Sequence, residues 1–110
     1  MKVRLIKKQT ILKYIALNKN SKVYFDNWLI NLKYCDWTKT NHIKESFNSA
    51  DILGKNSDRV IFNIGGNNYR IICSYFFGRT NVHLFICWIG THAEYDKICK
   101  KNLQYTINKY

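Results

Sequence analysis

One segment near the end of the chain carries side chains that could act on a phosphodiester. Thr91 and Glu94 have the spacing of a capping box at a helix start, so His92 is expected at the first helical position. A helix N-terminus favours anions and disfavours an imidazolium. We therefore expect His92 to tend toward the neutral imidazole, with a phosphate docked beside it. A neutral imidazole can accept the proton of a ribose 2′-hydroxyl that attacks the adjacent phosphorus.

Two further side chains share a helix face with His92. Tyr95 and Asp96 follow it by three and four positions. Tyr95 could donate a proton to the leaving oxygen or stack on a base, and Asp96 could orient the imidazole. Simpler interpretations stay open: Glu94 as a cap alone, Tyr95 as a core residue, and His92 as a surface histidine without chemistry.

Segments rich in Ile, Val, Phe and Tyr precede this site and are typical of strands. They are Arg59–Ile64, Asn67–Phe77 and Val82–Ile89. Gly65 and Gly66 predict a two-residue hairpin turn, because glycine adopts a positive φ without strain. In that turn Ile64 pairs with Asn67.

The predicted pairing divides the strand residues between two faces. The apolar face, expected to pack on helices, holds Val60, Phe62, Ile64, Tyr69, Ile71, Cys73, Val82, Leu84, Ile86 and Trp88. The other face, expected to be less buried, holds Arg59, Asn63, Asn68, Arg70, Ser74 and His83 among Ile61, Ile72, Phe76 and Phe85. Cationic side chains can bind phosphates and aromatic rings can stack on bases, so the second face is predicted to be a nucleic-acid platform. The alternative is a row of solvated strand charges.

The same register places the histidine. Ile89 is expected opposite Asn68, so His92 should emerge near the glycine turn, within reach of Asn67 and Arg70. Arg70 could then neutralise the charge that develops on phosphorus.

The first half of the chain is mainly helical in pattern. We expect a strand at Val3–Ile6, helices at Lys7–Leu17, Lys22–Cys35 and Asn41–Phe47, and a short strand at Ala50–Gly54. After Gly90 the pattern is helical again, and the tail from Ile98 to Tyr110 is expected to extend that last helix. The sequence thus predicts one α/β (α+β) domain over residues 1–110.

Bulk composition limits the function classes. Hydrophobic residues make up 46% of the 110 residues, which indicates a folded chain. Eighteen Lys and Arg against seven Asp and Glu give a net charge of +11. This excess points to a polyanionic partner such as nucleic acid, an anionic membrane or an acidic protein, or else only to solubility.

Targeting and metal signals are absent from the sequence. No apolar run approaches the roughly 20 residues of a membrane span, and the basic N-terminus lacks the apolar region of a signal peptide. We therefore expect a cytoplasmic protein without membrane contact. The cysteines have no zinc-type spacing, so we expect free, mostly buried thiols and neither metal nor cofactor.

Two motifs resemble the HigB family of toxins in the RelE superfamily, both in their order and in their separation along the chain. They are VIFNIGGNNYR at 60–70 and GTHAEYDK at 90–97. Cys35-Asp36-Trp37 and the stretch 47–51 are also similar to that family, so the resemblance covers about residues 1–97. It implies helices packed on a curved, mainly antiparallel sheet. It also implies cleavage of messenger RNA without a metal, commonly on the translating ribosome.

The resemblance further implies a HigA-type antitoxin with a helix-turn-helix domain, through which operator DNA would be bound. The candidate catalytic residues are His92, Arg70 and Tyr95, and the candidate RNA-binding residues are Arg59, Asn63, Asn67, Asn68 and Lys97. Two other functions stay open. One is an RNA- or ribosome-binding module that blocks translation by occupancy, and the other is a structural partner of a DNA-bound repressor.

Overall fold

Helices dominate the first half of the chain and strands the second, as the sequence predicts. The computed structural model describes residues 1–110, which form four α-helices, two 3-10 helices and five strands. The helices are α1 (Gln9–Leu17), η1 (Lys19–Ser21), α2 (Lys22–Lys33), α3 (Thr40–Ser46), α4 (His92–Lys100) and η2 (Leu103–Tyr105). The strands are β1 (Lys2–Ile6), β2 (Asp51–Ile52), β3 (Arg59–Ile64), β4 (Tyr69–Phe77) and β5 (Asn81–Thr91). The predicted elements before Gly90 are confirmed.

The five strands form one open, mixed sheet in the order β1-β5-β4-β3-β2. β1 pairs with β5 in parallel, and every other pair of neighbours is antiparallel. The expectation of a mainly antiparallel sheet is confirmed. β5, which leads into the candidate site, therefore lies inside the sheet, between the first strand of the chain and β4.

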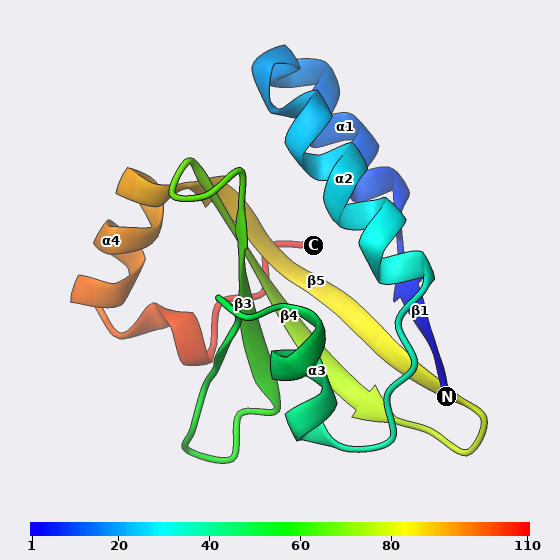
Figure 1. Ribbon diagram of the computed structural model, residues 1–110. Coiled ribbons are helices and arrows are strands. Elements are labelled where there is room, and N and C mark those ends of the chain that lie inside the picture. The colour runs from blue at the N-terminus through cyan, green and yellow to red at the C-terminus, as the bar shows by residue number, and fades with distance from the viewer.

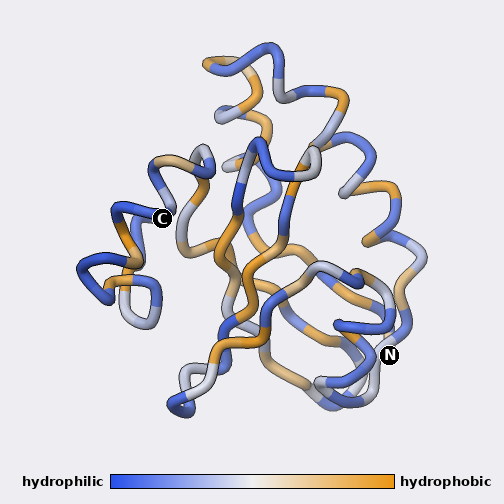
Figure 2. Tube along the Cα trace, turned by 60° about the vertical axis from the view of Figure 1, so that its left-hand side comes forward, coloured by the Kyte–Doolittle hydropathy of each residue, from blue (hydrophilic) through white to orange (hydrophobic).

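The main core lies between one face of the sheet and the helices α1, α2 and α3 (Figure 1). Ile11, Phe25 and Ile43 on these helices have no exposed surface. Trp28 of α2 meets Phe62 of β3 edge to face, with 5.2 Å between ring centroids. Figure 2 shows hydrophobic stretches running through the middle of the fold and hydrophilic ones gathered in loops and outer helix turns. None of the helices has the length and apolar character needed to cross a lipid bilayer.

The hairpin between β3 and β4 is longer than predicted. Ile64 pairs with Tyr69 rather than Asn67, so the loop spans the four residues 65–68. Gly65 and Gly66 both have a positive φ, near 63° and 65°. The predicted register was wrong by two residues, and because side chains alternate with a period of two, the assignment of β3 and β4 residues to faces is unaffected.

The assignment of Trp88 to the apolar core face was wrong. A β-bulge in β5 breaks the alternation, because Ile72 pairs with Trp88 whereas Cys73 pairs with Ile86. Trp88 therefore lies on the other face, where it joins Ile61, Ile72, Cys87 and Ile98 in a second, smaller core cluster. The predicted pairing of Ile89 with Asn68 also fails, since Ile89 pairs with Ile71.

The C-terminal tail does not extend the last helix. α4 ends at Lys100, and Asn102 adopts a left-handed conformation with φ of 56°, which is a common helix stop for Asn. The chain then forms η2 and returns across the second face of the sheet to β5, where the Lys109 amide donates to the Cys87 carbonyl at 2.8 Å. α4 thus covers the part of the second face nearest the hairpin (Figure 1), and η2 and the tail cover this face as far as Arg59, at the other end of β3.

A glycine is required at position 65 both by the positive φ of its backbone and by its close contact with α2. A Cβ atom at Gly65 would lie 2.7 Å from Cγ of the Tyr24 ring, whereas a Cβ atom at Gly66 would meet nothing within 4 Å. We expect Gly65→Ala to lower the free energy of unfolding by at least about 2 kcal/mol, since it adds a clash to the left-handed strain. Gly66→Ala, the matched control, should cost only about 1 kcal/mol. Urea unfolding measures both, and equal losses would contradict the role of Tyr24.

Arg59 holds the tail to the sheet. It is only 9% exposed, and one of its terminal nitrogens donates to the Ile107 carbonyl at 2.6 Å and to the Gln104 carbonyl at 3.2 Å. We expect Arg59→Ala to cost about 2–3 kcal/mol, because charge-assisted bonds are lost and buried carbonyls are left unpaired. Hydrogen exchange at the Lys109 amide should accelerate in this variant. Arg79→Ala, in an exposed turn, should change stability by less than about 0.5 kcal/mol, and an unchanged tail in Arg59→Ala would refute the assignment.

Candidate functional site

The predicted capping box at the start of α4 is confirmed. The Glu94 amide donates to the Thr91 hydroxyl at 3.2 Å, and the Thr91 amide donates to the Glu94 carboxylate at 2.8 Å. β5 runs to Thr91 and α4 begins at His92 with no loop between them. His92 therefore lies at the first helical position, on a helix start that is fixed by a strand inside the sheet.

The hairpin tip lies directly beside this helix start. Thr91 pairs with Tyr69 across the sheet, and the His92 amide donates to the Asn68 carbonyl at 3.1 Å. The predicted position of His92 next to the glycine turn is confirmed, although β5 reaches it by running two residues further than expected.

His92 and Asp96 form the predicted pair on one face of α4. Nε2 of His92 lies 3.5 Å from a carboxylate oxygen of Asp96, and the two side chains are 47% and 55% exposed. Asp96 thus faces Nε2, which leaves Nδ1 of the exposed imidazole free for a substrate. The carboxylate lies where it could orient the ring, the role expected for Asp96 from the sequence.

Tyr95 is half buried, on the side of α4 that faces the sheet. Its ring packs on that of Trp88, with 6.2 Å between centroids, in the second core cluster. Burial raises the pKa of the Tyr95 phenol, helped by a hydrogen bond to Cys99, while the charge of Arg70 acts in the opposite direction. Tyr95 is therefore both a packing residue and a phenol that keeps its proton, so it could act as a proton donor but not as a base at neutral pH.

Arg70 was expected on an exposed face, and that expectation was wrong. Its side chain is only 6% exposed, and three hydrogen bonds tie it to the hairpin: to the Tyr69 carbonyl at 2.9 Å, to Oδ1 of Asn67 at 3.3 Å and to the Gly66 carbonyl at 3.5 Å. A guanidinium has five N–H donors. Arg70 thus braces the hairpin and still holds donors and charge close to Tyr95.

Arg59 is also buried, beneath the tail, and it lies apart from His92. Arg59 is buried because the unpredicted turn after α4 brings the carbonyls of residues 104 and 107 over it. The remaining candidate RNA-binding residues differ in exposure: Asn67, Asn68 and Lys97 are exposed, and Asn63 is partly buried on β3 beside Arg70. The face predicted as a nucleic-acid platform is therefore half covered.

The sequence did not lead us to expect the Trp88 ring beneath Tyr95. One signal was available, because Ile86, Cys87, Trp88 and Ile89 are apolar in succession, and such a run cannot alternate between an apolar and a polar face. Gly90 is part of the same arrangement, since a Cβ atom there would lie 2.4 Å from the Trp88 ring.

The thiols follow the prediction: Cys35, Cys73 and Cys87 are buried and Cys99 is partly buried, all unpaired. Burial raises the pKa of Cys73 well above its ordinary value. No group of three or more His, Cys, Asp or Glu side chains is placed to hold a metal ion.

The chain is a small, basic α+β domain with an open sheet and a histidine at the junction of strand and helix. Residues 21–98, well over half of the chain, match the family model HigB_toxin, described as the RelE-like toxic component of a toxin–antitoxin system. The chain belongs to this HigB toxin family. A comparison with curated proteins finds no match. Family membership makes an antitoxin the expected partner.

The capping box offers a direct test of how α4 is held at the site. Thr91→Ala should lower the free energy of unfolding by about 1 kcal/mol, because the Glu94 amide loses its acceptor. Thr91→Ser, the matched control, keeps the hydroxyl and should retain most of that stability. Thermal unfolding followed by circular dichroism compares the three proteins. A Thr91→Ala protein as stable as the parent would contradict this role of the cap.

Proposed function

We propose that this toxin is an endoribonuclease that cleaves messenger RNA by a metal-independent attack of the ribose 2′-hydroxyl, and that it acts on the translating ribosome. The observation that carries the proposal is the placement of His92. Its imidazole is exposed, its Nε2 lies 3.5 Å from the Asp96 carboxylate, and it stands at a capped helix start beside the hairpin. A helix start attracts the phosphate that the reaction needs.

The reaction can be written with the groups at this junction. Nδ1 of His92 accepts the 2′-hydroxyl proton, the 2′-oxygen forms a bond to phosphorus, and the bond from phosphorus to the 5′-oxygen breaks. The Tyr95 phenol, which keeps its proton because it is half buried, donates to the departing 5′-oxygen. The products are a 2′,3′-cyclic phosphate and a 5′-hydroxyl. The helix start stabilises the charge that builds up on the phosphoryl oxygens, and Arg70, which is nearly buried, acts on them through its charge and not by direct contact.

RNA contacts around the reaction centre would come from exposed residues of the hairpin and α4. Asn67 and Asn68 lie at the hairpin tip and Lys97 lies on α4. Asn63 is only partly exposed, and Arg59 would contribute through its charge alone while the tail covers it. The partner would be a HigA-type antitoxin whose helix-turn-helix domain brings the complex to operator DNA.

One observation favours a second candidate, a non-catalytic module that blocks translation by occupancy. Arg70 is nearly buried, and its hydrogen bonds go to the hairpin itself rather than outward. A module of this kind would use the same basic surface, and it would leave its RNA intact.

Growth arrest and product analysis distinguish the two candidates. Expression of the parent chain should arrest growth, and His92→Ala should relieve the arrest, since loss of a general base costs about 10²–10⁴-fold in cleavage rate. His42→Ala is the matched control, because His42 lies at the start of α3, where Nδ1 accepts the Thr38 amide at 3.0 Å. Both purified proteins should keep the parent circular dichroism spectrum.

The cleaved RNA should end in a 2′,3′-cyclic phosphate, and a single 2′-deoxyribose at the cut site should abolish cutting. Tyr95→Phe should slow cleavage, whereas its effect on folding should be small, because the ring still packs on Trp88. Undiminished toxicity of His92→Ala with intact RNA would reject the enzyme and favour occupancy.

A further inference from the structure

A second group of exposed side chains lies on the open face of the sheet, away from His92. α4 and the tail cover this face from the hairpin as far as Arg59, but Phe76 and Phe85 on β4 and β5 are 61% and 43% exposed. Large apolar side chains exposed together commonly mark an interaction site. Neither residue belongs to the two motifs that connect the chain to its family.

The strand register gathers these residues into two adjacent rows. In the first row Arg4 of β1 pairs with His83 of β5, which pairs with Phe76 of β4. In the second row Ile6 pairs with Phe85, Phe85 with Ser74, and Ser74 with Arg59. Side chains at paired positions share a face and lie roughly 5 Å apart at their Cβ atoms. Val3 and Leu5 pack against the main core, so Arg4 points to the open face.

The rings of Phe76, His83 and Phe85 form a continuous aromatic strip. The His83 and Phe85 rings are stacked, with 6.3 Å between centroids and 23° between planes. Phe76 and His83 lie 6.2 Å apart at 37°. Exposed rings on a sheet are the platform on which single-stranded nucleic acids stack their bases.

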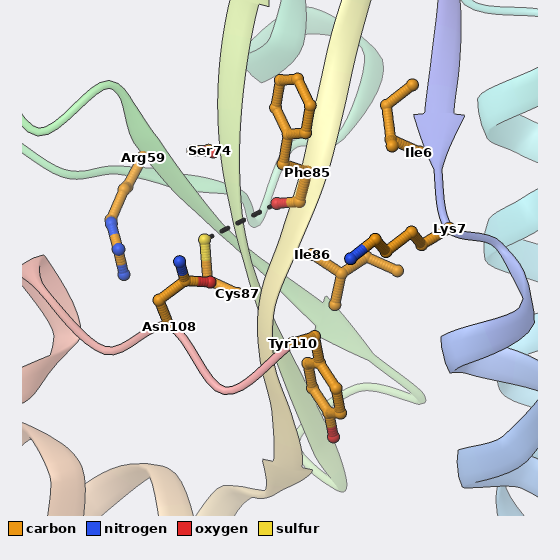
Figure 3. Close-up of a pocket in the computed structure, with 9 residues that line it drawn as sticks. All are labelled: Ile6, Lys7, Arg59, Ser74, Phe85, Ile86, Cys87, Asn108 and Tyr110. Carbon is orange, nitrogen blue, oxygen red and sulfur yellow. Dashed lines mark hydrogen bonds between the residues drawn. The ribbon is translucent and has the colours of Figure 1, made fainter.

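The surroundings of the aromatic strip are positively charged. β1, β3, β4 and β5 contain no Asp or Glu. A hollow of about 310 Å³ continues the face beyond Phe85, and Figure 3 shows Lys7 and Arg59 reaching toward it from opposite sides. Lys7 follows β1 directly and has a φ of 62°, a conformation that costs energy for any residue other than glycine. Lys7 thus has an unfavourable backbone conformation and places a positive charge over a face without acidic side chains. This arrangement suits an anionic ligand.

From these observations we infer that the aromatic strip binds a single-stranded segment of RNA, with bases stacked on Phe76, His83 and Phe85 and phosphates close to Arg4 and Lys7. The choice of RNA as ligand rests on the proposed function. β5 spans about 20 Å from Phe85 to Thr91 at the usual rise per residue. The strip would therefore hold RNA at a distance from the scissile linkage, which separates binding from cleavage.

Binding of an RNA that cannot be cut tests this inference. The probe is a fluorescently labelled oligonucleotide with 2′-O-methyl groups at every position, titrated with the full-length chain and followed by anisotropy. Phe76→Ala/Phe85→Ala should weaken binding about tenfold or more, since each base stacked on a ring contributes strongly to affinity. The matched control is Ile30→Ala, because Ile30 is 55% exposed on α2, and its affinity should equal that of the parent.

A second pair of variants separates stacking and charge from effects on folding. Phe76→Leu/Phe85→Leu keeps apolar side chains and should lose affinity as well, because leucine offers no ring. Arg4→Ala should reduce the salt dependence of binding by about one counterion. Its control is Arg79→Ala, in the turn between β4 and β5, which should leave the salt dependence unchanged.

Parent affinity in both phenylalanine variants would overturn the inference. A second result would also overturn the inference: the parent self-associates through these residues in sedimentation, and the variants keep the RNA affinity of the parent. That result would assign the strip to contacts between copies of the chain. The modified RNA has no 2′-hydroxyl, so these outcomes do not depend on whether His92 catalyses. A parent chain that binds the probe through the strip but leaves unmodified messenger RNA on translating ribosomes intact would refute only the proposed enzyme.

Discussion

The passage of β5 directly into α4 is the constraint on which the rest of the site depends. A hydrogen bond from the His92 amide to the Asn68 carbonyl joins this junction to the hairpin tip, and the capping box closes the first turn of the helix. Because no loop intervenes, the position of His92 is set by a strand that has neighbours along much of its length. The backbone of His92 is thus fixed before any substrate binds, which is one part of what preorganisation requires.

The bulge in β5 determines what lies beneath the site. By breaking the alternation it places Trp88 on the open face, where the indole ring covers Gly90 and supports Tyr95. The packing that anchors α4 is also what buries the phenol and raises its pKa. One irregularity of a single strand thus links the packing of the last helix to the acidity of the Tyr95 phenol.

Two arginines show how the net positive charge is divided between structure and binding. Arg59 and Arg70 donate mainly to backbone carbonyls, of the tail and of the hairpin respectively. A buried guanidinium is stable when such acceptors surround it, and unfavourable otherwise. The charges free to meet a polyanion are therefore the exposed ones, among them Arg4, Lys7 and Lys97.

The amino-acid sequence alone predicts the local elements: hydrophobic periodicity indicates the helices and strands, and Thr91 and Glu94 mark the helix start with His92 in its first turn. It also brought His92 to the hairpin, because pairing of adjacent strands follows from short turns. Three features depended on contacts between distant residues and so escaped it. The glycine loop packs against Tyr24 of α2, the bulge lies in a strand with core residues on both faces, and the tail is bonded through its carbonyls to Arg59. Burial of the two arginines depends on which backbone carbonyls lie within reach of each guanidinium, and those contacts form only when the chain folds.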